Sequence, residues 1–273
     1  MKALLILVLA LASIVALLYF RQHKMIYFPR PYDGWYDRSQ YSRAERLAFS
    51  SSEGKQVAFY LPPQDLTKKL PERLWVVFGG NASLALDWYT FFSDFPDRSA
   101  AFLLVDYPGY GDGTGTATPE TIEESANLAL ATLASKLGIT KEEFESRLNV
   151  LGHSLGAAAA LSFARGHKLS RLVLLSPFTS LSDMARRVVG YPLSLLLRHR
   201  YDNEEALEVV TKRANPPTIY IIHGSQDEII PVEMGRALAD RFREYVQYIE
   251  IEGGEHNTLL DTAKKQIVGV MIG

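Results

Sequence analysis

Cysteine is absent from the 273-residue sequence, and no block of five or more like charges occurs in it. The absence of cysteine excludes disulfide bonds, thiolate nucleophiles, zinc fingers and iron–sulfur clusters. The 29 basic and 31 acidic residues give a formal net charge of −2. Because nucleic-acid binding draws on a concentrated basic face, we expect no nucleic-acid partner.

The N-terminal stretch is apolar. From residue 3 to residue 20, only Ser13 and Tyr19 carry polar side-chain atoms. A helix of that length rises about 27 Å, which is just enough to cross a bilayer. We therefore expect residues 1–24 to form an uncleaved single-pass membrane anchor. A signal peptide cleaved after the Ala-Leu-Ala at 10–12 fits less well, because the apolar run continues for eight residues beyond that point.

The charges that flank this stretch leave its orientation open. Lys2 favours a cytoplasmic N-terminus, whereas Arg21, Lys24 and Arg30 favour a cytoplasmic position for the other end. The sequence therefore predicts a membrane location without the side on which residues 25–273 lie.

Residues 25–273 contain no Gly/Ser-rich linker and no repeat, which favours one domain. Short Val- and Leu-rich runs alternate with helical stretches, as parallel βαβ units require. Two further runs, at 47–50 and 56–61, read as an antiparallel hairpin at the sheet edge. We expect an α/β fold, with a mostly parallel sheet covered by helices on both faces and a short helical cap over about 179–217. The expected parallel strands are 74–78, 101–106, 148–151, 171–175, 218–223 and 246–251.

The pentapeptide Gly-His-Ser-Leu-Gly at 152–156 follows a predicted strand and opens an Ala-rich helix. A Gly-x-Ser-x-Gly turn in that context holds the serine hydroxyl out over the sheet edge. Ser154 is therefore the candidate nucleophile, and a serine needs a neighbouring base that is oriented by an acid.

Two later strand ends supply that base and acid. Asp227 follows the strand at 218–223, and His256 follows the strand at 246–251. Parallel strands end at one sheet edge, so we expect both side chains near Ser154. Asp202 is the reserve for the acid, and Asp106 and Glu255 stay open. The remaining candidate histidines are expected to be structural: His153, His167, His199 and His223.

The oxyanion of the reaction needs two N–H donors. We expect one from the backbone of Leu155, directly after the serine, and the other from the backbone of Asn81, in the Gly-rich loop after the strand at 74–78. Asn81 also begins a glycosylation sequon, but a sugar there would block the site. No nucleotide-binding or metal-ligand spacing is found, so neither a cofactor nor a metal is expected.

Several motifs together resemble those of α/β-hydrolase serine hydrolases, in particular a small membrane-anchored branch. They are GHSLG at 152–156, HGSQDEIIP at 223–231, GGEHN at 253–257, DYPGYG at 106–111 and SPFTSLSDMA at 176–185. The resemblance implies the α/β-hydrolase fold, with Ser154 as nucleophile, Asp227 as acid and His256 as base. It also implies carboxylic esters, thioesters or lipid acyl esters as substrates.

Three functions follow from these observations. The first is hydrolysis of lipid or acyl esters or thioesters through an acyl-enzyme. The second is a peptidase or amidase on the same triad, and the third is a non-catalytic, membrane-tethered binding protein. Apolar residues in the cap either line an acyl pocket or pack the cap itself: Val188, Val189, Tyr191, Leu193, Leu195, Leu196 and Leu197.

Overall fold

The structure is a computed structural model that describes residues 1–34, 36–65, 67 and 70–273. In that part of the chain, eight strands form one sheet in the order β1-β2-β4-β3-β5-β6-β7-β8. The first two pairings in that order, β1 with β2 and β2 with β4, are antiparallel, and the others are parallel. The strands are β1 (Glu45–Ser51), β2 (Gly54–Leu61), β3 (Arg73–Phe78), β4 (Ala100–Val105), β5 (Leu148–His153), β6 (Arg171–Leu175), β7 (Thr218–Gly224) and β8 (Val246–Ile251).

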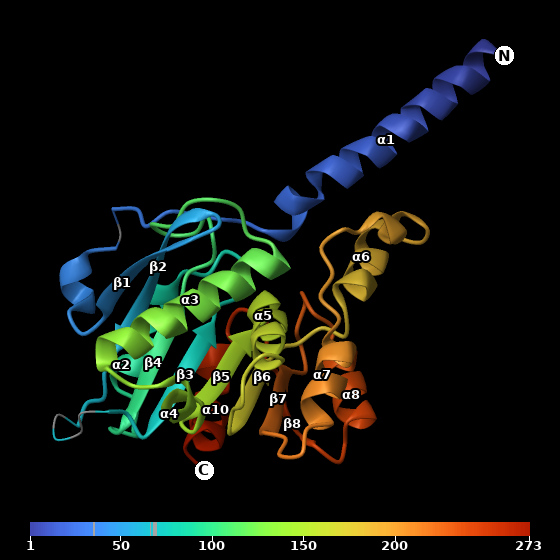
Figure 1. The fold of residues 1–273 in the computed structure, drawn as a ribbon. Helices are drawn as coiled ribbons and strands as arrows, with labels where there is room; N and C mark the ends of the chain where they lie inside the picture. Colours follow the sequence, from blue (N-terminus) through green and yellow to red (C-terminus); the bar gives the residue numbers. More distant parts are fainter. Residues whose placement is uncertain (35, 66, 68–69) are drawn as a thin grey trace.

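Helices cover both faces of the sheet (Figure 1). Helices α3, α5, α7 and α8 contribute to the core on one face, and α2, α9 and α10 to the core on the other. They are α1 (Lys2–Ile26), α2 (Tyr89–Ser93), α3 (Pro119–Leu137), α4 (Lys141–Glu145), α5 (Leu155–Ala164), α6 (Leu181–Val189), α7 (Asn203–Thr211), α8 (Val232–Arg241), α9 (Leu259–Thr262) and α10 (Lys264–Ile272), with 3-10 helices η1 (Arg38–Tyr41), η2 (Ala85–Trp88) and η3 (Leu193–Leu196).

The alternation of side chains along each strand explains the two cores. In β3, Leu74, Val76 and Phe78 belong to one core, and Trp75 and Val77 to the other. Because both faces are covered, the central strands read as continuous apolar runs in the sequence. The expected mostly parallel α/β sheet with helices on both faces is therefore confirmed.

The segment between β6 and β7 divides into two parts. Helix α6 and η3 stand away from the sheet (Figure 1), whereas α7 packs against α5 through Ala206, Leu207 and Val210. We use "cap" for residues 179–202, whose ends meet through the hydrogen bonds Leu181 N to Tyr201 O, 2.8 Å, and Asn203 N to Thr179 O, 3.0 Å. Helix α7 thus belongs to the helical layer, because its apolar side is buried there.

Helix α1 projects from the domain, and its last turn joins the domain (Figure 1). It continues past the apolar stretch through Arg21–Lys24, and His23 lies 2.9 Å from the carbonyl of Ala117. Tyr27, directly after the helix, is buried in the core. The expected membrane-spanning helix over residues 1–24 is corrected here: among the described residues, no helix has both the length and the apolar character that a bilayer crossing requires.

Candidate active site

Ser154 stands at a sharp turn between β5 and α5. Its backbone has φ 57° and ψ −121°, a conformation that non-glycine residues rarely adopt. The two glycines of the pentapeptide make this turn possible. A Cβ on Gly152 would lie 2.1 Å from the carbonyl oxygen of Gly156, and a Cβ on Gly156 would lie 2.2 Å from that of Phe78. The sequence therefore lets α5 begin directly against β3, with Ser154 at its N-terminus.

The structure brings Ser154, His256 and Asp227 together at the carboxyl edge of the sheet. His256 Nε2 lies 3.0 Å from Ser154 Oγ, and His256 Nδ1 lies 2.8 Å from one oxygen of Asp227 and 3.0 Å from the other. Each of these side chains is less than a tenth exposed. The three form a continuous chain of hydrogen bonds, in the arrangement that a serine nucleophile requires.

Asp227 is held as a carboxylate. Burial by itself would raise its pKa, but hydrogen bonds from His223 and His256 outweigh the burial and hold the pKa well below its usual value. The backbone N–H groups of Ile229 and Ile230 also donate to its Oδ1, at 3.0 and 2.7 Å. A carboxylate anchored in this way fixes the orientation of the His256 ring and stabilises a positive charge on it.

His153 lies against His256, with ring centroids 4.9 Å apart. Burial, and then the neighbouring His256, lower the pKa of His153 to about 3. His153 is therefore neutral near pH 7, and only a neutral ring borders this side of His256. The expectation of a purely structural His153 did not include this contact, which the local turn sequence does not reveal.

The loop after β3 passes close to the serine. A Cβ on Gly80 would lie 3.5 Å from the Cβ of Ser154. Helix geometry leaves the Leu155 N–H without a partner inside α5. In the described residues, the N–H groups of Leu155 and Asn81 donate to no other backbone carbonyl. Both therefore remain candidate oxyanion donors.

The side chain of Asn81 contacts the end of α1 and the residues that follow it. Its Nδ2 donates to the carbonyl of Ile26 at 2.6 Å, and its Oδ1 accepts from Phe28 N and Tyr110 Oη, both at 3.0 Å. The loop that carries the candidate oxyanion donor therefore holds the chain directly after α1. These contacts of the Asn81 side chain were not predicted from the sequence, where only its backbone N–H was a candidate.

The rival acids lie elsewhere. Asp106 is buried and accepts hydrogen bonds from Ala85 N and Tyr32 Oη, both at 2.8 Å. Asp202 caps α7 by accepting from Glu205 N at 2.9 Å. Glu255 is exposed. Among the carboxylates of the described residues, only Asp227 is hydrogen-bonded to the ring of His256.

The other histidines have separate partners. His167 Nε2 lies 2.7 Å from Asn127 Oδ1, and His199 packs against the Tyr27 ring with centroids 5.5 Å apart. His223 Nε2 lies 2.9 Å from the Ile230 carbonyl and 3.3 Å from Asp227. His223 thus supports the loop that carries the acid.

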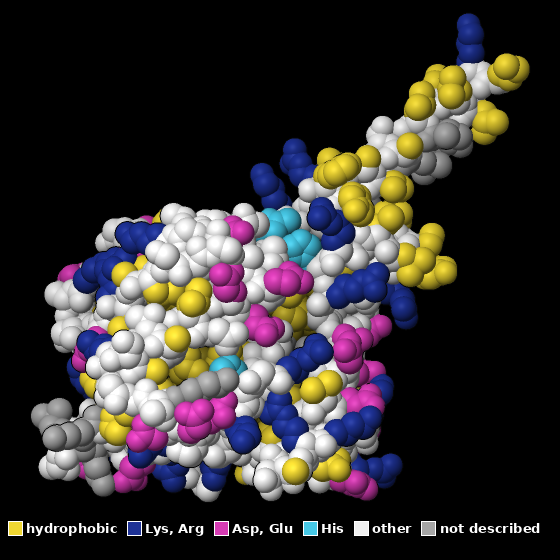
Figure 2. Space-filling view, viewed as in Figure 1, with side chains coloured by type: hydrophobic (Ala, Val, Ile, Leu, Met, Phe, Trp, Pro, Cys, Tyr) yellow, Lys and Arg dark blue, Asp and Glu magenta, His cyan; other side chains and the backbone are white. Residues whose placement is uncertain are grey.

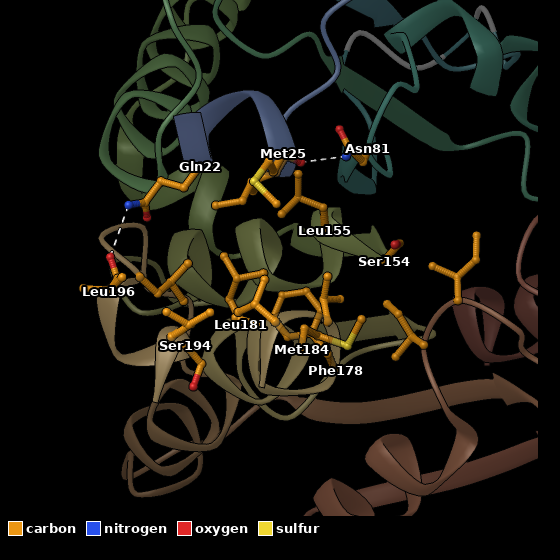
Figure 3. A pocket seen from close by; sticks show the side chains of 18 residues that line it. Gln22, Met25, Asn81, Ser154, Leu155, Phe178, Leu181, Met184, Ser194 and Leu196 are labelled. Atoms are coloured by element: carbon orange, nitrogen blue, oxygen red, sulfur yellow. Dashed lines mark hydrogen bonds between the residues drawn. The ribbon is translucent and has the colours of Figure 1, made fainter. Parts of the chain in front are cut away.

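Ser154 opens into a pocket of about 310 Å³ between the last turn of α1 and the cap (Figure 3). Of the seven cap residues singled out from the sequence, five line it, whereas Tyr191 and Leu195 point to solvent. Residues from α1 were not expected here. The lining comprises Gln22, Met25, Ile26, Asn81, Ser154, Leu155, Phe178, Leu181, Met184, Ala185, Val188, Val189, Leu193, Ser194, Leu196, Leu197, Ile229 and Ile230.

A metal site is not found near this pocket. Across the residues that the structure describes, no three His, Asp or Glu side chains gather in a way that could hold a metal ion.

Sequence comparisons identify related proteins. The profile of the alpha/beta hydrolase family matches residues 75–213. An uncharacterized protein of Mycobacterium tuberculosis is 31% identical over 155 residues, which are 57% of this chain and 52% of that protein. The human alpha/beta hydrolase domain-containing protein 17B is 28% identical over 152 residues, 56% of this chain and 49% of that protein. The chain thus spans about half the length of these two curated relatives.

Solved structures share the fold. An esterase of Pyrococcus furiosus matches with a TM-score of 0.66 and 14% identity, over 90% of this chain and 95% of that one. The S-formylglutathione hydrolase of Staphylococcus aureus matches with a TM-score of 0.63 and 17% identity, over 84% of this chain and 98% of that one. At these identities the likeness concerns the fold alone. With the family profile matching half of its length, the chain belongs to the alpha/beta hydrolase family.

Proposed function

We propose that this protein is a serine hydrolase that cleaves carboxylic esters or thioesters of apolar acyl groups. The observation that carries the proposal is the chain of hydrogen bonds from Ser154 through His256 to Asp227. Ser154, at one end of this chain, opens into an apolar pocket. Each member stands at a strand end, so the rigid sheet holds the reacting atoms in place.

In the proposed reaction, Ser154 Oγ attacks the acyl carbonyl while His256 Nε2 takes its proton. The carbonyl oxygen becomes negatively charged and is stabilised by the N–H groups of Leu155 and Asn81. His256 then gives its proton to the leaving alcohol or thiol, which departs as the C–O or C–S bond breaks. Water, deprotonated by His256, attacks the acyl-serine and releases the acid, and Ser154 recovers its proton.

The character of the pocket favours an acyl group over a peptide. Aliphatic side chains and Phe178 dominate the lining, and apart from Ser154 the polar lining side chains are Gln22, Asn81 and Ser194. A peptide would bring unpaired N–H and C=O groups into this apolar space, which costs free energy. An alkyl chain has no such groups.

A fluorophosphonate probe tests the nucleophile, because it labels only an activated serine. We expect labelling and p-nitrophenyl ester hydrolysis by the natural sequence, and neither by Ser154→Ala. Ser170→Ala changes an exposed serine and is the matched control, with both readouts retained. Failure of the natural sequence to label would favour the non-catalytic binding protein. Faster turnover of aminoacyl amides than of esters would favour the amidase.

We also propose that the apolar part of α1 associates with a lipid bilayer. Figure 2 shows hydrophobic side chains along the projecting helix, and Leu4, Ile6 and Phe20 are each about two-thirds exposed or more. Exposed apolar surface of this extent calls for a covering partner. Flotation with phosphatidylcholine vesicles tests this: the chain as it stands should float, and a variant with Leu4, Ile6, Leu9 and Phe20 changed to serine should stay below.

A further inference from the structure

Gln22 is a buried polar residue in the last turn of α1, only 8% exposed. Its Nε2 donates to the carbonyl of Tyr19 at 2.8 Å and to that of Leu196 at 3.2 Å. Its Oε1 accepts from the backbone N–H of Arg198 at 2.6 Å. One side chain therefore ties the end of α1 to the cap, across 174 residues of sequence to Leu196.

This tie lies at the end of the pocket away from Ser154. In Figure 3, the Gln22–Leu196 hydrogen bond and Ser194 stand at one end of the lining and Ser154 toward the other. Met25 and Leu155 lie on one side between these ends, and Leu181, Met184 and Phe178 lie on the other. Ser194 is also buried, at 6% exposed. Two buried polar residues, Gln22 and Ser194, thus lie at the end of the lining opposite Ser154.

An alkyl chain cannot pass this point without a loss of hydrogen bonds. To make room, Gln22 would have to leave Leu196 and Arg198, and the partly buried carbonyl and N–H of the cap would lose their partner. An alkyl chain offers no donor or acceptor in return, so the lost bonds are not replaced. A longer alkyl chain is therefore opposed both by the space that the Gln22 side chain fills and by the loss of its hydrogen bonds.

We propose that Gln22, through its hydrogen bonds to the cap, sets the longest acyl chain that the enzyme accepts. The inference rests on the proposed ester hydrolysis and adds a specificity-determining residue to it. Turnover should therefore fall steeply once the acyl chain is long enough to reach Gln22.

A series of p-nitrophenyl esters from acetate to palmitate measures this limit as kcat/KM against chain length. In Gln22→Ala we expect the fall to move to longer chains, with the palmitate-to-acetate ratio of kcat/KM rising about tenfold or more. Gln22→Met keeps an unbranched side chain of similar length but loses the hydrogen bonds, and it should move the limit in the same direction. Gln22→Met also tests the proposal if Gln22→Ala does not fold.

Two control variants distinguish the effect of the Gln22 hydrogen bonds from a nonspecific effect of substitution on the pocket. Gln40→Ala changes an exposed glutamine that does not line the pocket and should leave the profile unchanged. Met25→Ala widens the middle of the pocket and should change the level of kcat/KM without moving the limit. An equal shift of the limit in Met25→Ala and Gln22→Ala would overturn the role of Gln22.

The outcomes distinguish the two proposals. If the Gln22 variants hydrolyse the acetate ester normally and keep the limit of the natural sequence, the inference about Gln22 is wrong and the ester hydrolase stands. If the natural sequence hydrolyses no ester of the series, the proposed function fails and the inference falls with it.

Discussion

The imidazole rings of His153 and His256 are in contact, with centroids 4.9 Å apart and a tilt of 34° between their planes. Only one of the two, His256, is positioned to take a proton from Ser154. The low pKa of its neighbour, about 3, means that proton transfer to His256 is not opposed by a second positive charge.

The titration of His153 predicts an effect on acid stability. Its pKa falls from 6.5 in the unfolded chain to about 3 in the folded one, so over this range the unfolded chain binds the extra proton. The free energy of unfolding should therefore decrease as the pH falls from 6.5 toward 3. His153→Phe keeps a ring against His256 and removes this loss. Urea unfolding at several pH values should show that the unfolding free energy of the variant rises relative to that of the natural sequence as the pH is lowered. A difference that stays constant with pH would contradict this prediction.

Asp106 predicts the opposite dependence. Burial raises its pKa from 3.8 to about 7, despite hydrogen bonds from Ala85 N and Tyr32 Oη. The folded state therefore binds the extra proton between pH 3.8 and 7, and the stability contributed by that proton is lost as the pH rises through this window. Asp106→Asn can still accept from Ala85 and never ionises. Its unfolding free energy relative to the natural sequence should rise across the window and level off above pH 7. A difference that stays flat would show that Asp106 does not titrate there.

Asp227→Asn tests the acid. An amide in this place cannot stabilise a positive His256 and favours the wrong tautomer, so kcat should fall about 10⁴-fold. Asp202→Asn is the matched control, because asparagine also caps helices well and position 202 caps α7. Its kcat in the same ester assay should equal that of the natural sequence. A comparable loss in Asp202→Asn would return Asp202 to the role of acid.

Gly156→Ala tests the close contact of α5 with β3. The new Cβ would meet the carbonyl oxygens of Phe78 and Gly79 at 2.2 and 2.3 Å, which backbone movement alone can relieve. We expect a decrease of about 3 kcal/mol in unfolding free energy, measured in urea, with reduced ester turnover because the adjoining loop carries Asn81. Gly166→Ala, whose Cβ would find its nearest atom at 3.8 Å, should change stability by about 0.5 kcal/mol at most. Similar losses in both variants would contradict the close-contact explanation.

Much of the fold could be predicted because its signals are local. The run at 171–175 is a strand over the same residues, and a capping box of Thr140 and Glu143, visible in the sequence, begins α4. Ser154, Asp227 and His256 could be placed at one sheet edge for the same reason: each lies shortly after the carboxyl end of a parallel strand.

The remaining features depend on contacts between distant segments. Gln22 was passed over because its partners lie in the cap, and the nearest polar residues in sequence, Arg21 and His23, suggested only a helix flank. Helix α7 was assigned to the cap because the chain between two strands shows its length but not which apolar side is buried. The side chain of Asn81 was missed for a similar reason, since Ile26 is 55 residues away.

The last turn of α1 gives the N-terminal region a part in the pocket beside Ser154. A shortened chain that begins at Tyr27 would keep Ser154, Asp227 and His256 but would lack Gln22, Met25 and Ile26 from the pocket. The pocket of such a chain would be open on the side that α1 covers. The substrate selectivity measured on it would therefore differ from that of the full chain. Measurements of selectivity on this protein therefore call for preparations in which residues 22–26 are retained, with any purification tag placed at the other end.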